Sequence, residues 1–226
     1  MRIPITKYGL PQAALFPVVV CTIMTVLFAV FRTAPGAMAA EGVLFAVLLW
    51  MLSFFRDPSR RIVQDETALL SPADGKVTDI AVVEDSGLGE RALRIGIFLS
   101  IFNVHLNRTP CSVRIEGLSY KKGRFRNAMS PESGRVNESN DVFMMRLEEP
   151  RDRLLVRQIS GAIARHIVCE AKENDEYRQG DRFGMIKFGS RTELYLPAPE
   201  DGRYDITVTT GDPVRAGLTP LVRYRR

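Results

Sequence analysis

The sequence predicts a mainly β protein, in which a compact antiparallel sandwich or barrel-like domain follows an N-terminal transmembrane helical hairpin. Three observations support this prediction. Apolar residues crowd into the first quarter of the 226-residue chain as two long runs. From about residue 57 onward, short runs rich in β-branched residues recur between turn residues, and several alternate apolar with polar side chains. Neither an internal repeat nor a low-complexity tract interrupts them.

The first element is the pair of apolar runs. Residues 13–31 contain no charged side chain, and residues 37–55 contain only Glu41. Each run is close to the ~20 residues that a helix needs to cross the hydrocarbon core of a bilayer. The segment 32–36 contains a Pro and a Gly, which predicts a tight turn between two spans. We therefore expect a membrane hairpin over residues 1–56 and a second domain over 57–226.

The basic residues around the runs predict their orientation. Two precede the first run, three follow the second and one lies in the turn: Arg2, Lys7, Arg56, Arg60, Arg61 and Arg32. This distribution places both ends and the C-terminal domain on the cytoplasmic side of the cell (inner) membrane. A cleaved signal peptide is an alternative, although no A-x-A site clearly follows the first run. A shallow hairpin in one leaflet is another, given Pro17 and Glu41.

Charge and cysteine content narrow the class of partner. The net charge is +5, and beside a membrane segment a basic balance favours lipid headgroups over nucleic acid. The three cysteines, Cys21, Cys111 and Cys169, have no metal-ligand spacing and do not form a C-x-x-C motif. Neither a disulfide framework nor a metal site is indicated.

Nine short runs predict the strands of the second domain. They are 75–83, 92–99, 112–116, 141–147, 154–159, 164–169, 182–188, 192–196 and 204–209. Only residues 170–177 have a helical pattern. The longest polar stretch, residues 126–141, is typical either of a substrate loop or lid or of a plain surface excursion.

Few residues suit proton transfer. The chain has two histidines, and histidine is the side chain that titrates near neutral pH. His105 lies where a strand runs into a Pro-marked turn, and a lone histidine there is more often structural than catalytic. His166 lies in a strand-like run and reads as structural. Asp74 precedes a glycine in a tight turn, and the glycine of Phe188-Gly-Ser190 is typical of a strand bulge.

Several motifs in register nevertheless resemble the phosphatidylserine decarboxylase family, in its short, membrane-anchored (type A-like) bacterial form. They extend over the last three quarters of the chain in the family's order. They are Phe54-Phe-Arg-Asp-Pro58, Ser71-Pro-Ala-Asp-Gly75, the segment around His105, Asn137-Glu-Ser-Asn140, Gln158-Ile-Ser-Gly161 and Gly184-Met-Ile-Lys-Phe-Gly-Ser190.

The resemblance implies a proenzyme that cuts itself between Gly189 and Ser190. The Ser190 hydroxyl attacks the Gly189 carbonyl, and elimination from the resulting ester followed by hydrolysis leaves a pyruvoyl group in place of Ser190. The products are a β chain, 1–189, and an α chain, 190–226, which stay together as a heterodimer. His105 and Asp74 are the implied base and its orienting partner.

The same resemblance implies the reaction. Phosphatidylserine in the membrane forms a Schiff base with the pyruvoyl group and yields phosphatidylethanolamine and carbon dioxide. Arg108, Lys187 and Arg191 are candidates to hold the lipid phosphate, from their charge and position. Two features depart from the family pattern: Arg108 stands where many members have a second histidine, and the cleavage motif reads Phe-Gly-Ser-Arg.

Two alternatives stay open. One is a decarboxylase of another serine-headed lipid, such as an archaeal ether analogue (archaetidylserine-like). The other is a non-catalytic, membrane-anchored β module. The sequence also leaves the oligomeric state, including a homo-oligomer, open.

Overall fold

The computed structural model of the chain describes residues 5–31, 34–84, 87–89, 91–124, 133–161, 166–187, 190–198 and 202–225. They divide into two compact units, Met1–Ser59 and Arg60–Arg226. Several positions used in the predictions lie outside the described residues: Arg2, Arg32, 126–132, 164–165, Phe188 and Gly189.

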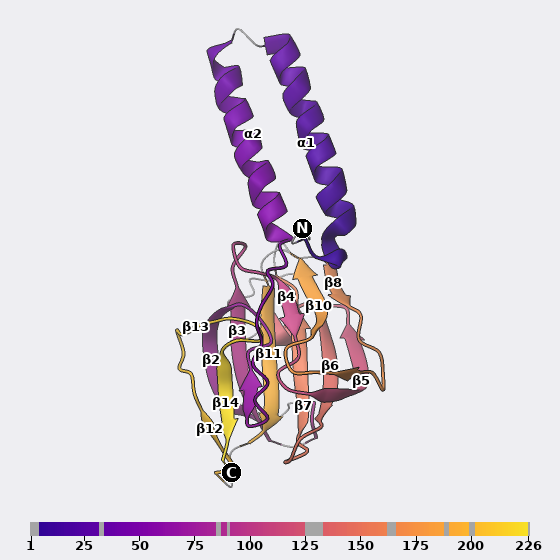
Figure 1. Cartoon of the computed structure of the whole chain (residues 1–226), viewed down its shortest axis with the longest axis vertical. Helices are drawn as coiled ribbons and strands as arrows, with labels where there is room; N and C mark the ends of the chain where they lie inside the picture. Colours follow the sequence, from indigo (N-terminus) through magenta and orange to yellow (C-terminus); the bar gives the residue numbers. More distant parts are fainter. Residues whose placement is uncertain are drawn as a thin grey trace. The chain divides into compact units, whose positions relative to one another are not determined.

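The first unit is a helical hairpin (Figure 1). A short 3-10 helix, η1 (Lys7–Gly9), leads into α1 (Leu10–Phe31), and α2 (Pro35–Phe54) returns beside it. Both long helices are apolar enough to cross a membrane by length and composition. Their outward side chains are apolar as well, with Val18 64% and Phe28 59% exposed. A surface of this kind suits lipid better than water. The predicted pair of apolar helices is therefore confirmed.

The second unit is built from antiparallel sheets, as Figure 1 shows. One sheet has eight strands in the order β13-β2-β3-β11-β7-β6-β5-β9, and two have three strands each, β1-β14-β12 and β4-β10-β8. A single turn of helix, α3 (Ser133–Val136), precedes β6. The strands are β1 (Ala68–Leu70), β2 (Gly75–Val83), β3 (Ala92–Leu99), β4 (Leu106–Arg108), β5 (Val113–Lys121), β6 (Ser139–Arg146), β7 (Arg153–Ile159), β8 (His166–Cys169), β9 (Glu176–Tyr177), β10 (Arg182–Lys187), β11 (Ser190–Pro197), β12 (Tyr204–Ile206), β13 (Pro213–Val214) and β14 (Pro220–Tyr224).

The core of this unit lies on one face of the eight-stranded sheet. Successive side chains of a strand point to opposite faces, so Leu194 and Leu196 of β11 enter the main apolar core. Tyr195 points the other way, into a smaller apolar cluster with Leu88 and Leu155. Because both faces of β11 are covered, all eight of its residues are buried. The central strand of the sheet is therefore well placed to hold a group away from water.

The predicted mainly β architecture is confirmed, and two strands agree in both bounds, 75–83 as β2 and 92–99 as β3. The helical interpretation of 170–177 is wrong. That segment is a turn in which Asp175 N donates to Lys172 O at 3.1 Å and Asn174 has φ 70°, followed by β9. A left-handed residue ends any helical run.

Candidate active site

Ser190 is the first residue of β11, where the chain passes from one sheet to another. Residues 188–189, outside the described residues, connect β10 of a three-stranded sheet to β11 of the eight-stranded sheet. Ser190 pairs with Leu99 at the end of β3. Its side chain is fully buried, and within the described residues its Oγ has no hydrogen-bond partner. A buried hydroxyl without a partner is costly and calls for a chemical explanation.

A buried chain of polar side chains fixes this start of β11. Thr192 lies on the same face as Ser190 and accepts a hydrogen bond at Oγ1 from Asn107 Nδ2 at 3.0 Å. Asn107 Oδ1 accepts from Gln158 Nε2 at 2.9 Å, and Gln158 Oε1 accepts from Asn140 Nδ2 at 3.0 Å. These residues are 6% exposed or less. The chain ties β4, β6, β7 and β11 together beneath Ser190.

Gly184 on β10 makes room for this chain. A Cβ at that position would lie 2.8 Å from Gln158 Nε2 and 2.3 Å from the Val168 carbonyl oxygen. Any side chain larger than hydrogen would therefore displace either the β8–β10 pairing or the Gln158 amide. Gly184 is the first residue of the motif that ends in Ser190, and its role is to allow this close approach.

His105 is held near the same strand ends. It is fully buried just before β4, and its carbonyl accepts a hydrogen bond from Ile186 N at 3.2 Å, four residues before Ser190. The Asn107–Thr192 hydrogen bond is a second link between the His105 and Ser190 segments, because Asn107 lies two residues after His105 and Thr192 lies two residues after Ser190. Sequence positions far apart are thus brought to one end of the domain.

The His105 ring has a defined orientation. Its Nδ1 lies 3.0 Å from the carbonyl oxygen of Asn103. A carbonyl only accepts hydrogen bonds, so Nδ1 carries the proton in this contact and Nε2 of the neutral ring is the atom able to take one up. The expected orienting partner was Asp74, but a backbone carbonyl holds this nitrogen instead.

Asp74 makes a different set of contacts. Its Oδ1 accepts from Arg60 Nη1 at 2.6 Å and from Ala216 N at 2.8 Å, and its Oδ2 accepts from Arg60 Nη2 at 2.7 Å. Both carboxylate oxygens are therefore used by a bidentate arginine pair and a backbone amide, and these bonds do not reach His105. The carboxylate is 8% exposed. Asp74 thus fixes the turn that enters β2.

The candidate phosphate contacts fall into different environments. Lys187 ends β10 and is 6% exposed, and burial lowers the pKa of its ammonium group. Arg108 is 4% exposed, and its Nη1 donates to the Gly180 carbonyl at 2.7 Å. Of the two, Lys187 lies closer to Ser190 along the chain.

Arg191 forms an internal ion network, which does not favour a role in binding a ligand phosphate. Its guanidinium is fully buried and donates to Glu193 Oε1 at 2.7 Å, to Thr78 Oγ1 at 2.6 Å and to Asp79 Oδ1. Burial opposes its charge, but the carboxylates of Glu193 and Asp79 outweigh burial and raise its pKa. Gly96 makes room for it, since a Cβ there would lie 1.9 Å from Arg191 Nη2.

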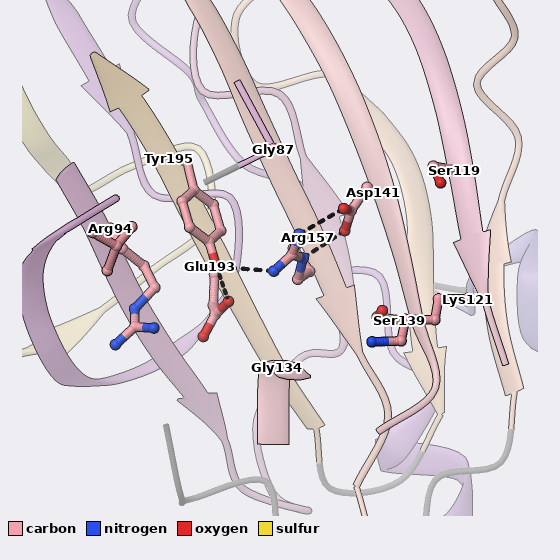
Figure 2. A pocket seen from close by; sticks show the side chains of 11 residues that line it. Gly87, Arg94, Ser119, Lys121, Gly134, Ser139, Asp141, Arg157, Glu193 and Tyr195 are labelled. Atoms are coloured by element: carbon pink, nitrogen blue, oxygen red, sulfur yellow. Dashed lines mark hydrogen bonds and ion pairs between the residues drawn. The ribbon is translucent and has the colours of Figure 1, made fainter. Parts of the chain in front are cut away.

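The pocket in Figure 2 lies on the face of the eight-stranded sheet opposite to Ser190. It has a volume of about 260 Å³, and Figure 2 shows Arg157 at its centre, in a bidentate ion pair with Asp141 at 2.6 and 2.7 Å. The Tyr195 hydroxyl links Arg157 to Glu193: it accepts a hydrogen bond from Arg157 and donates one to Glu193 Oε2 at 2.6 Å. Because Tyr195 and Ser190 differ by an odd number of positions on β11, this pocket is separate from the serine.

The chemistry available near Ser190 is that of hydroxyl, imidazole and amine groups. Within the described ranges, no three His, Cys, Asp or Glu side chains gather into a set able to bind a metal. All three cysteines are unpaired, and burial raises the pKa of the Cys111 thiol, which keeps it protonated.

Sequence reasoning missed several residues of this site. Thr192 could have been recognised as a polar side chain at a position that alternates with core residues. Gln158 begins the motif Gln158-Ile-Ser-Gly161, but the motif alone assigned it no role. Asn103 acts through its backbone, which leaves no signal in the side-chain pattern. Asn107 lies in the segment around His105, but its neighbours gave no indication of what it would contact.

Comparison with known proteins identifies relatives over most of the chain. The model of the family described as phosphatidylserine decarboxylase matches residues 47–221. A protein of Rhodopirellula baltica named phosphatidylserine decarboxylase proenzyme is 41% identical over 209 residues, covering 90% of this chain and 85% of that protein. Proteins with the same name from Carboxydothermus hydrogenoformans and Chlorobium phaeobacteroides are 37% and 38% identical over 226 and 219 residues. The alignment with the Carboxydothermus protein covers 100% of both chains, and the alignment with the Chlorobium protein covers 97% of this chain and 99% of that protein.

Proposed function

The chain belongs to the phosphatidylserine decarboxylase family, and from this premise we propose how its own residues carry out processing and decarboxylation. It is a decarboxylase made as a proenzyme, and it converts phosphatidylserine to phosphatidylethanolamine. The observation that carries the residue assignment is the buried Ser190 hydroxyl, which has no hydrogen-bond partner among the described residues. Neither a non-catalytic β module nor a decarboxylase of another serine-headed lipid has comparable support.

In the processing step, the Ser190 Oγ attacks the carbonyl carbon of Gly189. A serine hydroxyl is a weak nucleophile until a base takes its proton. His105 is the proposed base, because its Nδ1–H is already held by the Asn103 carbonyl and its Nε2 is the nitrogen that can accept a proton. The Gly189–Ser190 amide bond breaks as the Oγ ester forms, which frees the Ser190 amine while the ester still joins the two chains. Elimination of the ester then releases the β chain with the Gly189 carboxylate, and hydrolysis of the dehydroalanine left at 190 gives a pyruvoyl group and ammonia at the start of the α chain.

A pyruvoyl group formed from Ser190 fits this position. Conversion would replace the Cβ hydroxyl, which has no hydrogen-bond partner among the described residues, by a methyl group that needs none, and would place the ketone on Cα in a site shielded from water by both faces of β11. When present, the group supplies the electron sink for decarboxylation of an amine-bearing substrate. His105 is the proposed donor of the proton that the product carbon takes up after carbon dioxide leaves. Lys187 is the proposed contact for the lipid phosphate, because it is cationic and three residues from Ser190.

Asp74 has a positioning role in this proposal. Its carboxylate fixes Arg60 and the Ala216 amide, and thereby the turn leading into β2. Gly75 begins β2, and a Cβ there would lie 2.1 Å from the Phe98 carbonyl oxygen. That close approach sets the end of β3, where Leu99 pairs with Ser190.

The two chains would stay associated without a covalent link. The α chain supplies β11, which lies between β3 and β7, and β14, which lies between β1 and β12. Strand β11 is therefore enclosed on both sides by strands of the β chain, and β14 is enclosed by β1 of the β chain and β12 of its own chain. We propose a heterodimer held by these ladders at the cytoplasmic side of the inner membrane, with the phospholipid as substrate.

The proposal is tested on a denaturing gel. The wild-type chain should migrate as two fragments, the smaller with 37 of the 226 residues, or about 4 of 25.4 kDa. Ser190→Ala should migrate as one chain of full length. Two fragments from Ser190→Ala, or a single full-length chain from the wild type, would contradict the assignment.

A further inference from the structure

The end of the eight-stranded sheet that holds Ser190 carries a distinct surface. Strand register places six residues in one row across the sheet, one position inside Ser190 and Leu99: Lys121, Ser139, Ile159, Arg191, Phe98 and Lys76. Residues at this row, beyond it or one position inside it form the end of the sheet from which a substrate would reach Ser190. We name the exposed side chains there the Ser190-end surface: Lys76, Phe102, Tyr120, Lys121, Lys122, Arg124, Arg215 and Leu218.

This surface is both aromatic and basic. Phe102 is 68% and Tyr120 61% exposed, and Leu218 is 41% exposed. The other five members are lysine or arginine. Among the described residues, the carboxylates of Asp74 and Glu138 at the same end are buried, so they add little to the potential outside. Apolar rings surrounded by cations are typical of surfaces that bind an anionic membrane.

The opposite end of the sheet differs. Exposed cations there pair with exposed carboxylates in two places, Arg91 with Glu84 at 3.0 Å and Arg114 with Glu176 at 2.7 Å. Such pairs largely cancel each other's charge at a distance.

Phe102 is presented by a stiff turn that also holds the catalytic histidine. Ser100 N donates to Asn103 Oδ1 at 2.9 Å, and Asn103 N donates to the Ser100 carbonyl at 2.9 Å. The carbonyl of Asn103, next to Phe102, accepts from His105 Nδ1 at 3.0 Å. A contact made by Phe102 therefore lies only three residues along the chain from His105, the proposed base.

We propose that the Ser190-end surface docks on an anionic lipid bilayer, with Phe102 inserted among the headgroups and the lysines and arginines on lipid phosphates. The identity of the partner rests on the proposed function, since phosphatidylserine is an anionic lipid that stays in its bilayer. Docking by this surface brings the headgroup to the end of β11 at which Ser190 lies. It also fixes the Ser100–Asn103 turn, and so the His105 ring, while lipid is bound.

The test uses fluorescence of the full chain in proteoliposomes of brominated phosphatidylcholine and phosphatidylserine. Trp50 is the single tryptophan, so Trp50→Phe combined with Phe102→Trp leaves one reporter at the turn. The matched control is Trp50→Phe with Val82→Trp, a 44% exposed position whose partner Leu93 lies six residues from Leu99. Six strand positions span roughly 20 Å. Strong quenching for Phe102→Trp and weak quenching for Val82→Trp is expected, and equal quenching at both positions overturns the proposal.

A second experiment reverses the charge of two residues of the Ser190-end surface. Lys122→Glu with Arg124→Glu should lower the decarboxylation rate on vesicles by roughly tenfold, and about 1 M salt should remove the difference from wild type. The rate on short-chain phosphatidylserine dispersed in neutral detergent should be unchanged. Arg151→Glu with Lys172→Glu makes the same charge change at the opposite end and should have no effect. Equal losses on vesicles and in detergent, or an equal loss in the control variant, overturn the docking surface.

The two arms separate this proposal from the function on which it rests. Quenching needs no catalysis, so strong quenching of the Phe102→Trp reporter together with an inactive wild-type protein would overturn the proposed function and support the docking surface. Burial of the Phe102→Trp reporter that depends on protein concentration in lipid-free detergent would indicate a second copy of the chain and overturn lipid docking.

Discussion

Arg191 donates from Nε to Oε1 of Glu193 at 2.7 Å, and both side chains are fully buried one and three positions after Ser190. Together with Thr78 and Asp79 of β2, this pair fastens the start of β11 to β2 across the intervening strand β3. The fastening matters most once the preceding peptide bond is cut, because Arg191 then becomes the second residue of a free chain end. The network thus keeps the new terminus in its site.

Arg191→Leu is expected to destabilise the fold strongly. Removing Arg191 takes this cationic partner from the fully buried Glu193 and leaves Asp79 with its 3.2 Å pair to Arg94, and breaking a buried ion network in this way costs about 3–5 kcal/mol. Urea unfolding in the Ser190→Ala background measures this on an uncut chain. Arg114→Leu is the control, because its pair with Glu176 has both side chains 55% exposed and should contribute less than about 1 kcal/mol. Similar losses for the two variants would refute a special role for the Arg191 network.

His105→Ala is expected to leave the precursor almost uncut. Loss of a general base slows a reaction by about 10²–10⁴-fold, and no second histidine lies in the same segment. The fraction of cut chain is measured by gel over time after synthesis. His166→Ala, which removes the only other histidine from an exposed position on β8, should be processed at the normal rate. Normal processing of His105→Ala would rule out its role as the base.

Asn107→Ala should weaken both stability and processing. It leaves the buried hydroxyl of Thr192 and the amide of Gln158 without the partners they have now, at a cost of about 1–3 kcal/mol. Unfolding and the rate of cutting are both measured. Thr207→Ala removes an exposed hydrogen bond to the Pro220 carbonyl and should affect neither by a comparable amount. If Asn107→Ala is destabilised but is cut at the wild-type rate, the polar side chains around Asn107 stabilise the fold without supporting the processing of Ser190, and this prediction is wrong.

Lys187→Met should stabilise the fold at neutral pH. Burial lowers the Lys187 pKa, so the folded chain releases this proton below the ordinary value of 10.5 while the unfolded chain still holds it. Stability of the wild type therefore rises with pH through the window just below 10.5, as the cost of the buried charge disappears. The advantage of Lys187→Met should shrink across that window in urea unfolding of the Ser190→Ala background. An advantage that grows with pH would contradict the sign of this shift.

The sequence predicted those parts of the molecule that periodicity encodes. The apolar runs became α1 and α2, and long alternating runs became β2 and β3. Strands β1, β4, β9 and β13 were missed, because two or three residues are too few to show alternation, and the five-residue strand β14 was missed as well. The helical pattern of 170–177 failed because local hydrogen bonds around Asn174 favour a turn.

The site was predicted less completely than the fold. Family motifs pointed to Ser190, His105 and Asp74, which the structure places at strand ends. The partners of these residues depend on long-range packing, which local pattern does not encode. The Asn103 carbonyl holds His105 in place of Asp74, and Arg191 binds Asp79, 112 positions away.

The most direct test of the central claim is the intact mass and N-terminal chemistry of the small chain. Residues 190–226 should begin with a pyruvoyl group: the fragment should have no free α-amine, should resist Edman sequencing and should react with a carbonyl reagent. A small fragment that begins with an ordinary serine amine, or that starts at any residue other than 190, would contradict self-processing at the Gly189–Ser190 bond.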